Sequence, residues 1–392
     1  MEIKQIGNFQ AIALILIIVI NHLVLGTPRT LIAETGTGTI LNMFYVFLVT
    51  IILVFIVTKL FNNFKGKDIV DISEFLGGKV LKFIVGIVYI LYFLLILSTT
   101  VRIIVQDLEI IYFENVSISV LTLLIIASIV FVYKYGSSAI IKCNSIIAPI
   151  AGIIILVIAF SNIQDFSLDR IFPILGFGAK ETFITGASNI FAYSGLAILY
   201  FIMPMLKDSR NFKKISIVST ILIGILIIGS VSSLVLSFPY IENINEISSL
   251  YVESRDISYW QVFQRIDGIF VFSWILALLS YISVVLFFIV IIFRKLTNTK
   301  KEFPVVLAFA ALTYAATLIP NNIFMIRFLE DVVFKYTNII VAIFLSFIIL
   351  ILANIKYKFV NRKNNLINNT IKDMPNENLY ENRNNWNNYI NN

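Results

Sequence analysis

Long apolar stretches alternate with short polar gaps along most of the chain. Ten apolar runs occupy approximately residues 9–26, 38–58, 83–106, 117–133, 144–162, 183–206, 215–238, 264–293, 304–326 and 332–355. Each run approaches or exceeds the ~20 residues that an α-helix needs to cross a hydrocarbon layer about 30 Å thick. The pattern therefore predicts an all-α polytopic membrane protein, with ten transmembrane helices in one transporter-like domain over residues 1–360.

Lysine and arginine residues gather in every second gap between these runs. Of the 30 Lys and Arg residues, 22 lie at the N-terminus, in alternate gaps or after the last run, and eight lie in or beside the other gaps. Because positively charged loops remain on the cytoplasmic side of a membrane, this bias predicts that both termini are cytoplasmic. An even number of helices also places both termini on the same side of the membrane.

The composition excludes several other classes of protein. With 59% hydrophobic and only 14% charged residues, the chain is too apolar for a soluble domain. The net charge of +7 comes from residues scattered through short gaps, which favours contact with anionic lipid rather than nucleic acid. We find no phosphate-binding glycine loop, histidine–carboxylate pair or serine nucleophile motif, so we expect neither an enzyme nor a cofactor.

The last 32 residues differ from the rest of the chain. Residues 361–392 contain 14 asparagines and almost no aliphatic pattern. Such a segment cannot bury enough apolar surface to offset the entropy lost on ordering. We expect an Asn-rich disordered cytoplasmic tail.

Two of the runs are interrupted near the middle of the membrane. In the first, the apolar residues stop at Leu25 and are followed by Gly26, Thr27 and Pro28; in the sixth, Ser194 and Gly195 lie at the centre. Division at the 163–182 loop gives two halves of five helices, each starting with an interrupted helix. Because five is odd, the second half would be inverted, and interrupted helices at matching places mark a transporter binding site. Glycine and proline are also common in membrane helices without such a role.

Several polar and aromatic side chains are predicted to meet at one depth. At 1.5 Å per residue, Ser194 lies roughly 17 Å and His22 roughly 20 Å into their helices. Trp274 lies at a depth similar to that of Ser194, and Tyr92 is about 15 Å in. His22, next to Asn21, is the only histidine. It is either a proton-sensitive or ligand-binding group, or a neutral side chain bonded to a neighbouring carbonyl or serine. A metal site is not expected, because no second histidine exists.

One arginine falls inside the third run. Counted from Lys82, Arg102 lies about 30 Å along the helix. We expect it at the outer interface, where its guanidinium extends to water and faces Asp107 or Glu109.

Four segments together resemble the spore germinant-receptor B subunit family, a branch of the amino acid–polyamine–organocation transporter superfamily. They are IGNFQAIALILIIVINHLVLGTPRTLIAETGTGTIL, LFNNFKGKDIVDISEFLGGKVLK, SGLAILYFIMPMLKD and QRIDGIFVFSWILALLSYISVVLFF. The likeness in length and helix number covers about residues 3–360. It implies a five-plus-five inverted repeat with helices one and six broken around a small-ligand pocket.

The resemblance also implies a function and partners. It implies a subunit in the spore inner membrane that binds a nutrient germinant, usually an amino acid, and signals to an A subunit, with a lipoprotein C subunit in the complex. The breaks map to Leu25, Gly26, Thr27 and Pro28 in helix one and to Tyr193, Ser194 and Gly195 in helix six. Amides after Gly26 would receive a carboxylate, carbonyls near Tyr193 an ammonium group, and Tyr92 and Trp274 would form an apolar wall.

One departure from the family pattern concerns the ligand. Many members carry a carboxylate in the middle of helix six, where this chain has Ser194. If that carboxylate normally receives an amino group, this protein would bind another ligand or sense the germinant indirectly. Two further functions stay open: an amino-acid or ion-coupled permease that translocates its substrate, and a scaffold that binds no ligand.

Overall fold

Within the part of the chain that the structure describes, seven helices are long and apolar enough to cross a membrane, and three further apolar helices are shorter. The computed structural model describes residues 5–24, 26–113, 115–161, 163–239, 253–254 and 266–372. Within these ranges, the only β-structure is an isolated bridge between Ile6 and Leu206. The predicted all-α class is therefore confirmed, while the number of ten membrane crossings stays a prediction.

The helices follow the apolar runs in order. They are α1 (Asn8–Val24) and α2 (Thr27–Thr35), α3 (Thr39–Phe61), α4 (Ile69–Ile111), α5 (Ile118–Tyr133), α6 (Ser137–Ser161), α7 (Ala179–Phe183), η5 (Thr185–Ile198) and α8 (Leu199–Ile202), α9 (Phe212–Ser237), α12 (Ile266–Thr297), α13 (Phe303–Thr317), and α14 (Ile323–Phe328), η8 (Leu329–Phe334), α15 (Lys335–Thr337), η9 (Asn338–Leu345) and α16 (Ser346–Lys372). We call α1 with α2 helix one, η5 with α8 helix six, and α14 through α16 helix ten.

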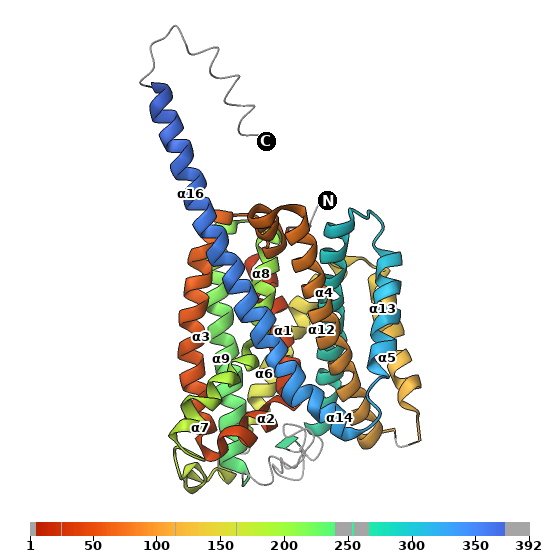
Figure 1. Cartoon of the computed structure of the whole chain (residues 1–392). Coiled ribbons are helices and arrows are strands. Elements are labelled where there is room, and N and C mark those ends of the chain that lie inside the picture. The colour runs from red at the N-terminus through yellow and green to blue at the C-terminus, as the bar shows by residue number, and fades with distance from the viewer. Residues whose placement is uncertain are drawn as a thin grey trace.

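Short 3₁₀ turns occupy the connections between the helices. They lie at Gly36–Gly38, Asn62–Phe64, Ile163–Asp165, Leu168–Ile171, Met203–Met205 and Ser209–Asn211. The start of α1 and the end of α16 lie at the same end of the bundle, whereas α2, α7 and α14 lie at the opposite end (Figure 1). We call these the terminal end and the far end.

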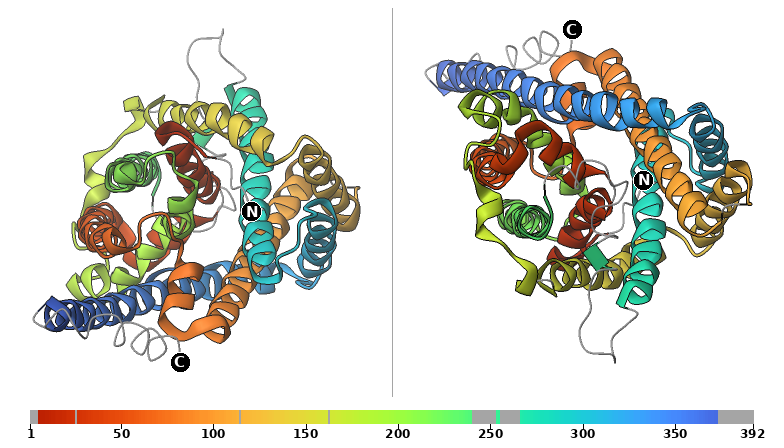
Figure 2. Two further views of the ribbon diagram at one scale, coloured as in Figure 1. Left: turned by 90° about the horizontal axis from the view of Figure 1, so that it is seen from above. Right: turned by 90° about the horizontal axis from the view of Figure 1, so that it is seen from below.

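Helix α1 lies in the interior of the bundle. From Ala11 to Val24 every residue except Ile12 is buried, and α1 packs against α6, α9, α12 and η5. Other helices surround it when the molecule is viewed from either end (Figure 2). An apolar helix without a polar face is stable in such surroundings.

The outer faces of the surrounding helices are apolar. Leu48 of α3 is 60% exposed and Phe344 of η9 is 59% exposed. Hydrocarbon tails suit such surfaces, whereas soluble proteins seldom expose them over large areas.

Ion pairs and caps fix the helices at the terminal end. Asp68 caps the start of α4, and its side chain and that of Asp71 each lie 2.5 Å from the Lys295 ammonium of α12. Helix α4 is kinked at Gly77 and Gly78, where Gly78 has a φ of 71°. The Lys356 ammonium of α16 donates to the carbonyls just before that kink. These contacts join α4, α12 and helix ten.

The expected exposure of Arg102 to water is wrong. Its side chain is only 4% exposed, and within the described residues Nε and Nη1 have no hydrogen-bond partner. It forms no ion pair there with Asp107 or Glu109. The physical reason is that α14 and η8 pack against α4 and cover its far end, so the guanidinium does not reach water.

The Asn-rich segment begins inside a helix. Helix α16 continues to Lys372, past residue 361. Residues 373–392 lie outside the described residues, so the disordered tail and its boundary stay a prediction.

Candidate ligand site at the interrupted helices

Helix one is interrupted where the sequence predicts. Helix α1 ends at Val24, and α2 begins at Thr27 with Pro28 in its first turn. Leu25 lies outside the described residues. Proline suits the first turn of a helix because the amide that it lacks has no partner there. The backbone amides at this new start need acceptors from elsewhere.

A carboxylate from helix ten occupies this break. The Gly26 amide donates a hydrogen bond to Glu330 of η8, and a Cβ atom at Gly26 would overlap that carboxylate. Glu330 Oε2 also lies 3.2 Å from Nη2 of Arg29. The positive end of a helix favours an anion. The chain thus supplies from Glu330 the carboxylate that we expected a ligand to bring.

Further polar contacts tie α2 to helix ten. Asp331 accepts from Arg29 Nη2 at 2.9 Å and from Thr30 Oγ1 at 2.7 Å. Lys335 pairs with Glu34, and its ammonium lies 5.6 Å from the centre of the Phe191 ring in η5. We call the five charged residues of this cluster the latch: Arg29, Glu34, Glu330, Asp331 and Lys335. It lies at the far end of the bundle.

Helix six is irregular over most of its length. Residues Thr185–Ile198 form 3₁₀ turns, and Tyr193 leaves the helical region with φ −89° and ψ 21°. Tyr193 and Ser194 are 3% and 7% exposed. Within the described residues, the Tyr193 hydroxyl and Ser194 Oγ have no hydrogen-bond partner. Buried polar atoms normally have one, which marks this place as a site for a ligand or water.

Gly195 has a packing role beside this break. A Cβ atom there would lie 2.7 Å from the Ile15 carbonyl oxygen of α1. The glycine thus permits close approach of helix six to helix one. Gly195 does not line the cavity described next.

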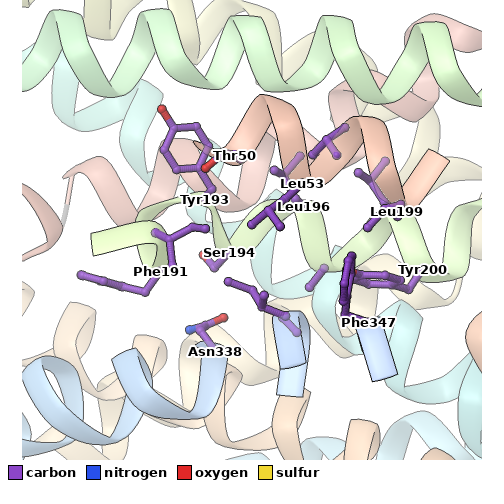
Figure 3. Close-up of a pocket in the computed structure, with 16 residues that line it drawn as sticks. Thr50, Leu53, Phe191, Tyr193, Ser194, Leu196, Leu199, Tyr200, Asn338 and Phe347 are labelled. Atoms are coloured by element: carbon purple, nitrogen blue, oxygen red, sulfur yellow. The ribbon is translucent and has the colours of Figure 1, made fainter. Parts of the chain in front are cut away.

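A cavity opens between α3, helix six and helix ten (Figure 3). It encloses about 570 Å³ of empty space, counting the space at its mouth. Tyr193 and Ser194 contribute to its wall, and none of its lining side chains is charged. The other lining residues are Thr50, Leu53, Val54, Val57, Ile190, Phe191, Leu196, Ala197, Leu199, Tyr200, Asn338, Ala342, Ile343 and Phe347. Its chemistry suits a largely apolar group with a few hydrogen-bonding atoms.

Helix ten contributes residues that the sequence analysis did not identify. Its segments η8 and η9 are π-helical, a geometry that often occurs at functional sites. Asn338 at the start of η9 lines the cavity and accepts from the Tyr92 hydroxyl at 2.5 Å. Tyr92 therefore does not line the cavity, but its hydroxyl is bonded to a residue that does. An Asn near the start of the apolar run 332–355 is the signal that could have identified it.

The predicted residues Asn21 and His22 of α1 form a second group, which contacts α12 and helix ten. Asn21 Nδ2 donates to the Ala277 carbonyl of α12 at 3.1 Å. The His22 ring lies between Tyr281 and Phe334, with centroid distances of 5.5 and 4.6 Å. Its Nε2 atom lacks a hydrogen-bond partner within the described residues.

Trp274 of α12 resembles this second group in its burial. Its side chain is 3% exposed, and in the described part of the chain Nε1 is unpaired. Asn21, His22, Tyr92, Gly26, Thr27, Pro28, Gly195 and Trp274 are not among the residues that line the helix-six cavity. The expected single site is thus divided between the cavity, the latch and the interior, and ligand binding by these residues stays a prediction.

Comparison with known proteins supplies the family. The family model described as "Spore germination protein" matches residues 5–326. The chain belongs to this family. The matched range includes both interrupted helices and supports a germination-related membrane protein.

Two relatives come from Bacillus subtilis (strain 168). Spore germination protein B2 is 24% identical over 249 residues, covering 60% of this chain and 67% of the relative. Spore germination protein YndE is 22% identical over 361 residues, covering 87% and 95%. Both support the family resemblance found in the sequence.

A solved transporter has the same fold. A Na⁺-coupled sialic acid symporter in a substrate-bound, outward-open state is similar with a TM-score of 0.57, covering 88% of this chain and 75% of the symporter. The sequences are 12% identical, so the likeness concerns the fold alone. The family and fold are those of permeases and transporters.

Proposed function

We propose that the protein is the membrane subunit of a nutrient germinant receptor. In this proposal it binds a small germinant, such as an amino acid, beside the helix-six break and signals to a partner A subunit, with a C subunit in the same complex. It lies in the spore inner membrane with both termini cytoplasmic, as the distribution of Lys and Arg favours.

The observation that carries the proposal is the cavity at helix six. It combines an apolar wall with two buried hydroxyls, of Tyr193 and Ser194, that lack partners within the described residues. A ligand that hydrogen-bonds to either hydroxyl removes the cost of leaving it unpaired. Because the lining residues are uncharged, the apolar part of a germinant fits there, and any charged end requires backbone groups at the break.

Ligand binding can reach a partner through the latch. Helix ten forms one wall of the cavity through Asn338 and Phe347, and the same helix holds Glu330 and Lys335. A ligand that binds better when helix ten has shifted would favour the state in which the latch opens. The A subunit would respond to that shift rather than to the ligand itself.

The alternative is a permease that translocates its substrate. The fold shared with a Na⁺-coupled symporter favours this function in the same way as it favours a receptor. Uptake measured in proteoliposomes that contain only this chain separates the two. A permease gives saturable uptake without a partner, whereas a receptor subunit binds its ligand without accumulating it.

Binding itself is tested by a thermal-shift screen of the purified protein against the twenty amino acids, purine nucleosides and simple sugars. A ligand of the native state raises the melting temperature with concentration. We expect at least one compound to do so, and the rise to disappear in Ser194→Leu, whose added carbons fill the cavity. The proposal is contradicted if no compound raises the melting temperature of the protein, either alone or together with its A subunit.

A further inference from the structure

The helix-six cavity has two chemically different ends. Tyr193, Ser194 and Asn338 lie at one end, whereas Leu199 and Phe347 lie at the other (Figure 3). Two opposite walls of the cavity, on α3 and on helix ten, are apolar towards this second end. We call these walls the trough: Leu53, Val54 and Val57 of α3, and Ala342, Ile343 and Phe347 of helix ten.

The mouth of the trough lies on the lipid-facing surface of the protein. Leu53 and Phe347 are half-buried, and their neighbours Ile52 and Ile348 are 61% and 52% exposed. Both α3 and helix ten lie at the periphery of the bundle (Figure 2). Because the exposed apolar faces of these two helices contact hydrocarbon tails, the mouth between them contacts hydrocarbon as well.

The cavity runs along the helices at the depth of the hydrocarbon layer. On α3, its lining extends from Thr50 to Val57, about 10 Å along the helix axis. Beyond this stretch, the seam between α3 and α16 is closed at the terminal end. There Asn354 donates to the Leu60 carbonyl at 3.0 Å and accepts from Asn63 at 2.8 Å. A molecule therefore enters the trough from the side, out of the bilayer, rather than along the seam from water.

We propose that the trough binds part of an acyl chain of a membrane phospholipid. An empty apolar cavity forfeits dispersion contacts, and water is not stable there because the walls offer it no polar partners. An acyl chain makes these contacts without burying a polar group. The uncharged walls do not suit a lipid headgroup, which stays outside the cavity with the rest of the lipid.

This inference concerns the same cavity as the proposed function but does not rest on it. The chain occupies the apolar end, and the hydroxyls of Tyr193 and Ser194 at the other end stay available to a germinant. Ala342, Ile343 and Phe347 belong to helix ten, so a bound chain favours the position of helix ten described here. Membrane lipid would thus regulate the helix that also carries half of the latch.

Photolabelling from the bilayer tests the proposal. The full chain is reconstituted into vesicles of phosphatidylcholine and phosphatidylglycerol that contain a phospholipid with a diazirine in one acyl chain, and mass spectrometry locates the label. Ile52 is 61% exposed and should be labelled by the surrounding lipid. Val54 and Val57 are only 5% exposed, so label on them requires a chain inside the trough. Val46 of α3, 1% exposed and outside the cavity, should carry none.

Matched variants complete the test. Ala342→Leu fills the trough and should abolish the label on Val54 and Val57 while that on Ile52 remains. Ala311→Leu adds the same carbons on the exposed face of α13 and should change neither label. The proposal is overturned if Val54 and Val57 are as free of label as Val46, or if Ala342→Leu does not reduce their label.

The wild-type labelling pattern decides the question even if Ala342→Leu does not fold. The two proposals also fail separately. Label in the trough together with a failed germinant screen contradicts the proposed function and supports the bound chain. A germinant that stabilises the protein without label in the trough has the opposite meaning.

Discussion

The two interrupted helices differ in whether the polar groups at the break have hydrogen-bond partners. At helix one, the freed amide of Gly26 is satisfied by the Glu330 carboxylate of helix ten. At helix six, the Tyr193 and Ser194 side chains are buried beside a cavity without hydrogen-bond partners in the described residues. A break in a membrane helix therefore does not by itself indicate a ligand site. The neighbouring side chains decide whether the break is closed or open.

This difference assigns separate roles to the two regions. The helix-one break, together with the latch, holds α2 against helix ten at the far end of the bundle. The helix-six break contributes to the wall of a cavity that helix ten also lines. Helix ten contacts both, so it is the element through which the two regions are coupled. Disruption of either region tests this division.

The largest effect is expected from removal of the carboxylate at the helix-one break. Glu330→Ala leaves Gly26 without its acceptor and Arg29, whose side chain is 9% exposed, with only one partner. Breaking a buried ion pair costs about 3–5 kcal/mol, so the melting temperature should fall clearly. Glu74→Ala is the control, because the Glu74 side chain is 38% exposed and its pair with Lys82 is worth about 1 kcal/mol or less. If the two variants lower the melting temperature equally, Glu330 does not close the helix-one break.

A smaller loss is expected where helix six touches helix one. Gly195→Ala places a methyl group 2.7 Å from the Ile15 carbonyl oxygen and should cost about 1–3 kcal/mol through overpacking. Gly268→Ala on α12 has open space around it and should be neutral or gain up to about 1 kcal/mol from helix propensity. Chemical or thermal denaturation of both variants in detergent measures the difference. If both variants change the free energy of unfolding by the same amount in the same direction, helix six does not pack closely against helix one at Gly195.

Two tyrosines give a matched pair with a still smaller effect. Tyr92→Phe removes the donor to Asn338 and should lower stability by about 1 kcal/mol. Tyr193→Phe removes a hydroxyl that has no partner within the described residues, so stability should not fall. Melting temperatures of both variants provide the measurement. A loss in Tyr193→Phe equal to that in Tyr92→Phe would mean that the helix-six break is already satisfied.

The smallest expected effect concerns ligand affinity rather than stability. Ser194→Ala should leave the melting temperature of the free protein unchanged, because its Oγ atom is unpaired within the described residues. Affinity for a ligand that bonds to this hydroxyl should fall by about fivefold, the equivalent of one hydrogen bond. Ser216→Ala on α9 is the control, since that hydroxyl bonds to its own helix. A ligand whose affinity is unaffected by Ser194→Ala does not bond to this hydroxyl.

Much of the architecture follows from hydropathy alone. The apolar runs correspond to the observed helices, and the glycines and proline in helix one mark its interruption, because lipid does not tolerate free backbone groups elsewhere. The buried interior position of α1 agrees with the uninterrupted apolar stretch from Ala11 to Ile20. These features are local, so a single sequence shows them.

The site was less predictable because it depends on contacts between distant helices. Glu330 lies about 300 positions from Gly26 and just outside the last apolar run, and nothing in the sequence shows that the two meet. Asn338 and Thr50 lie in apolar runs where one polar residue often bonds to its own helix. Arg102 illustrates the opposite error, since depth along a helix does not show that another helix covers it.

Cysteine accessibility compares the two breaks most directly. Cys143 is the only cysteine and is exposed, so Cys143→Ser provides a background for single Ser194→Cys and Thr27→Cys variants. A small methanethiosulfonate reagent is applied to the protein in vesicles. We expect Ser194→Cys to react and Thr27→Cys to react only when combined with Glu330→Gln, which weakens the latch. Rapid reaction at Thr27→Cys with Glu330 intact, or no reaction at Ser194→Cys, would contradict an open break at helix six and a closed one at helix one.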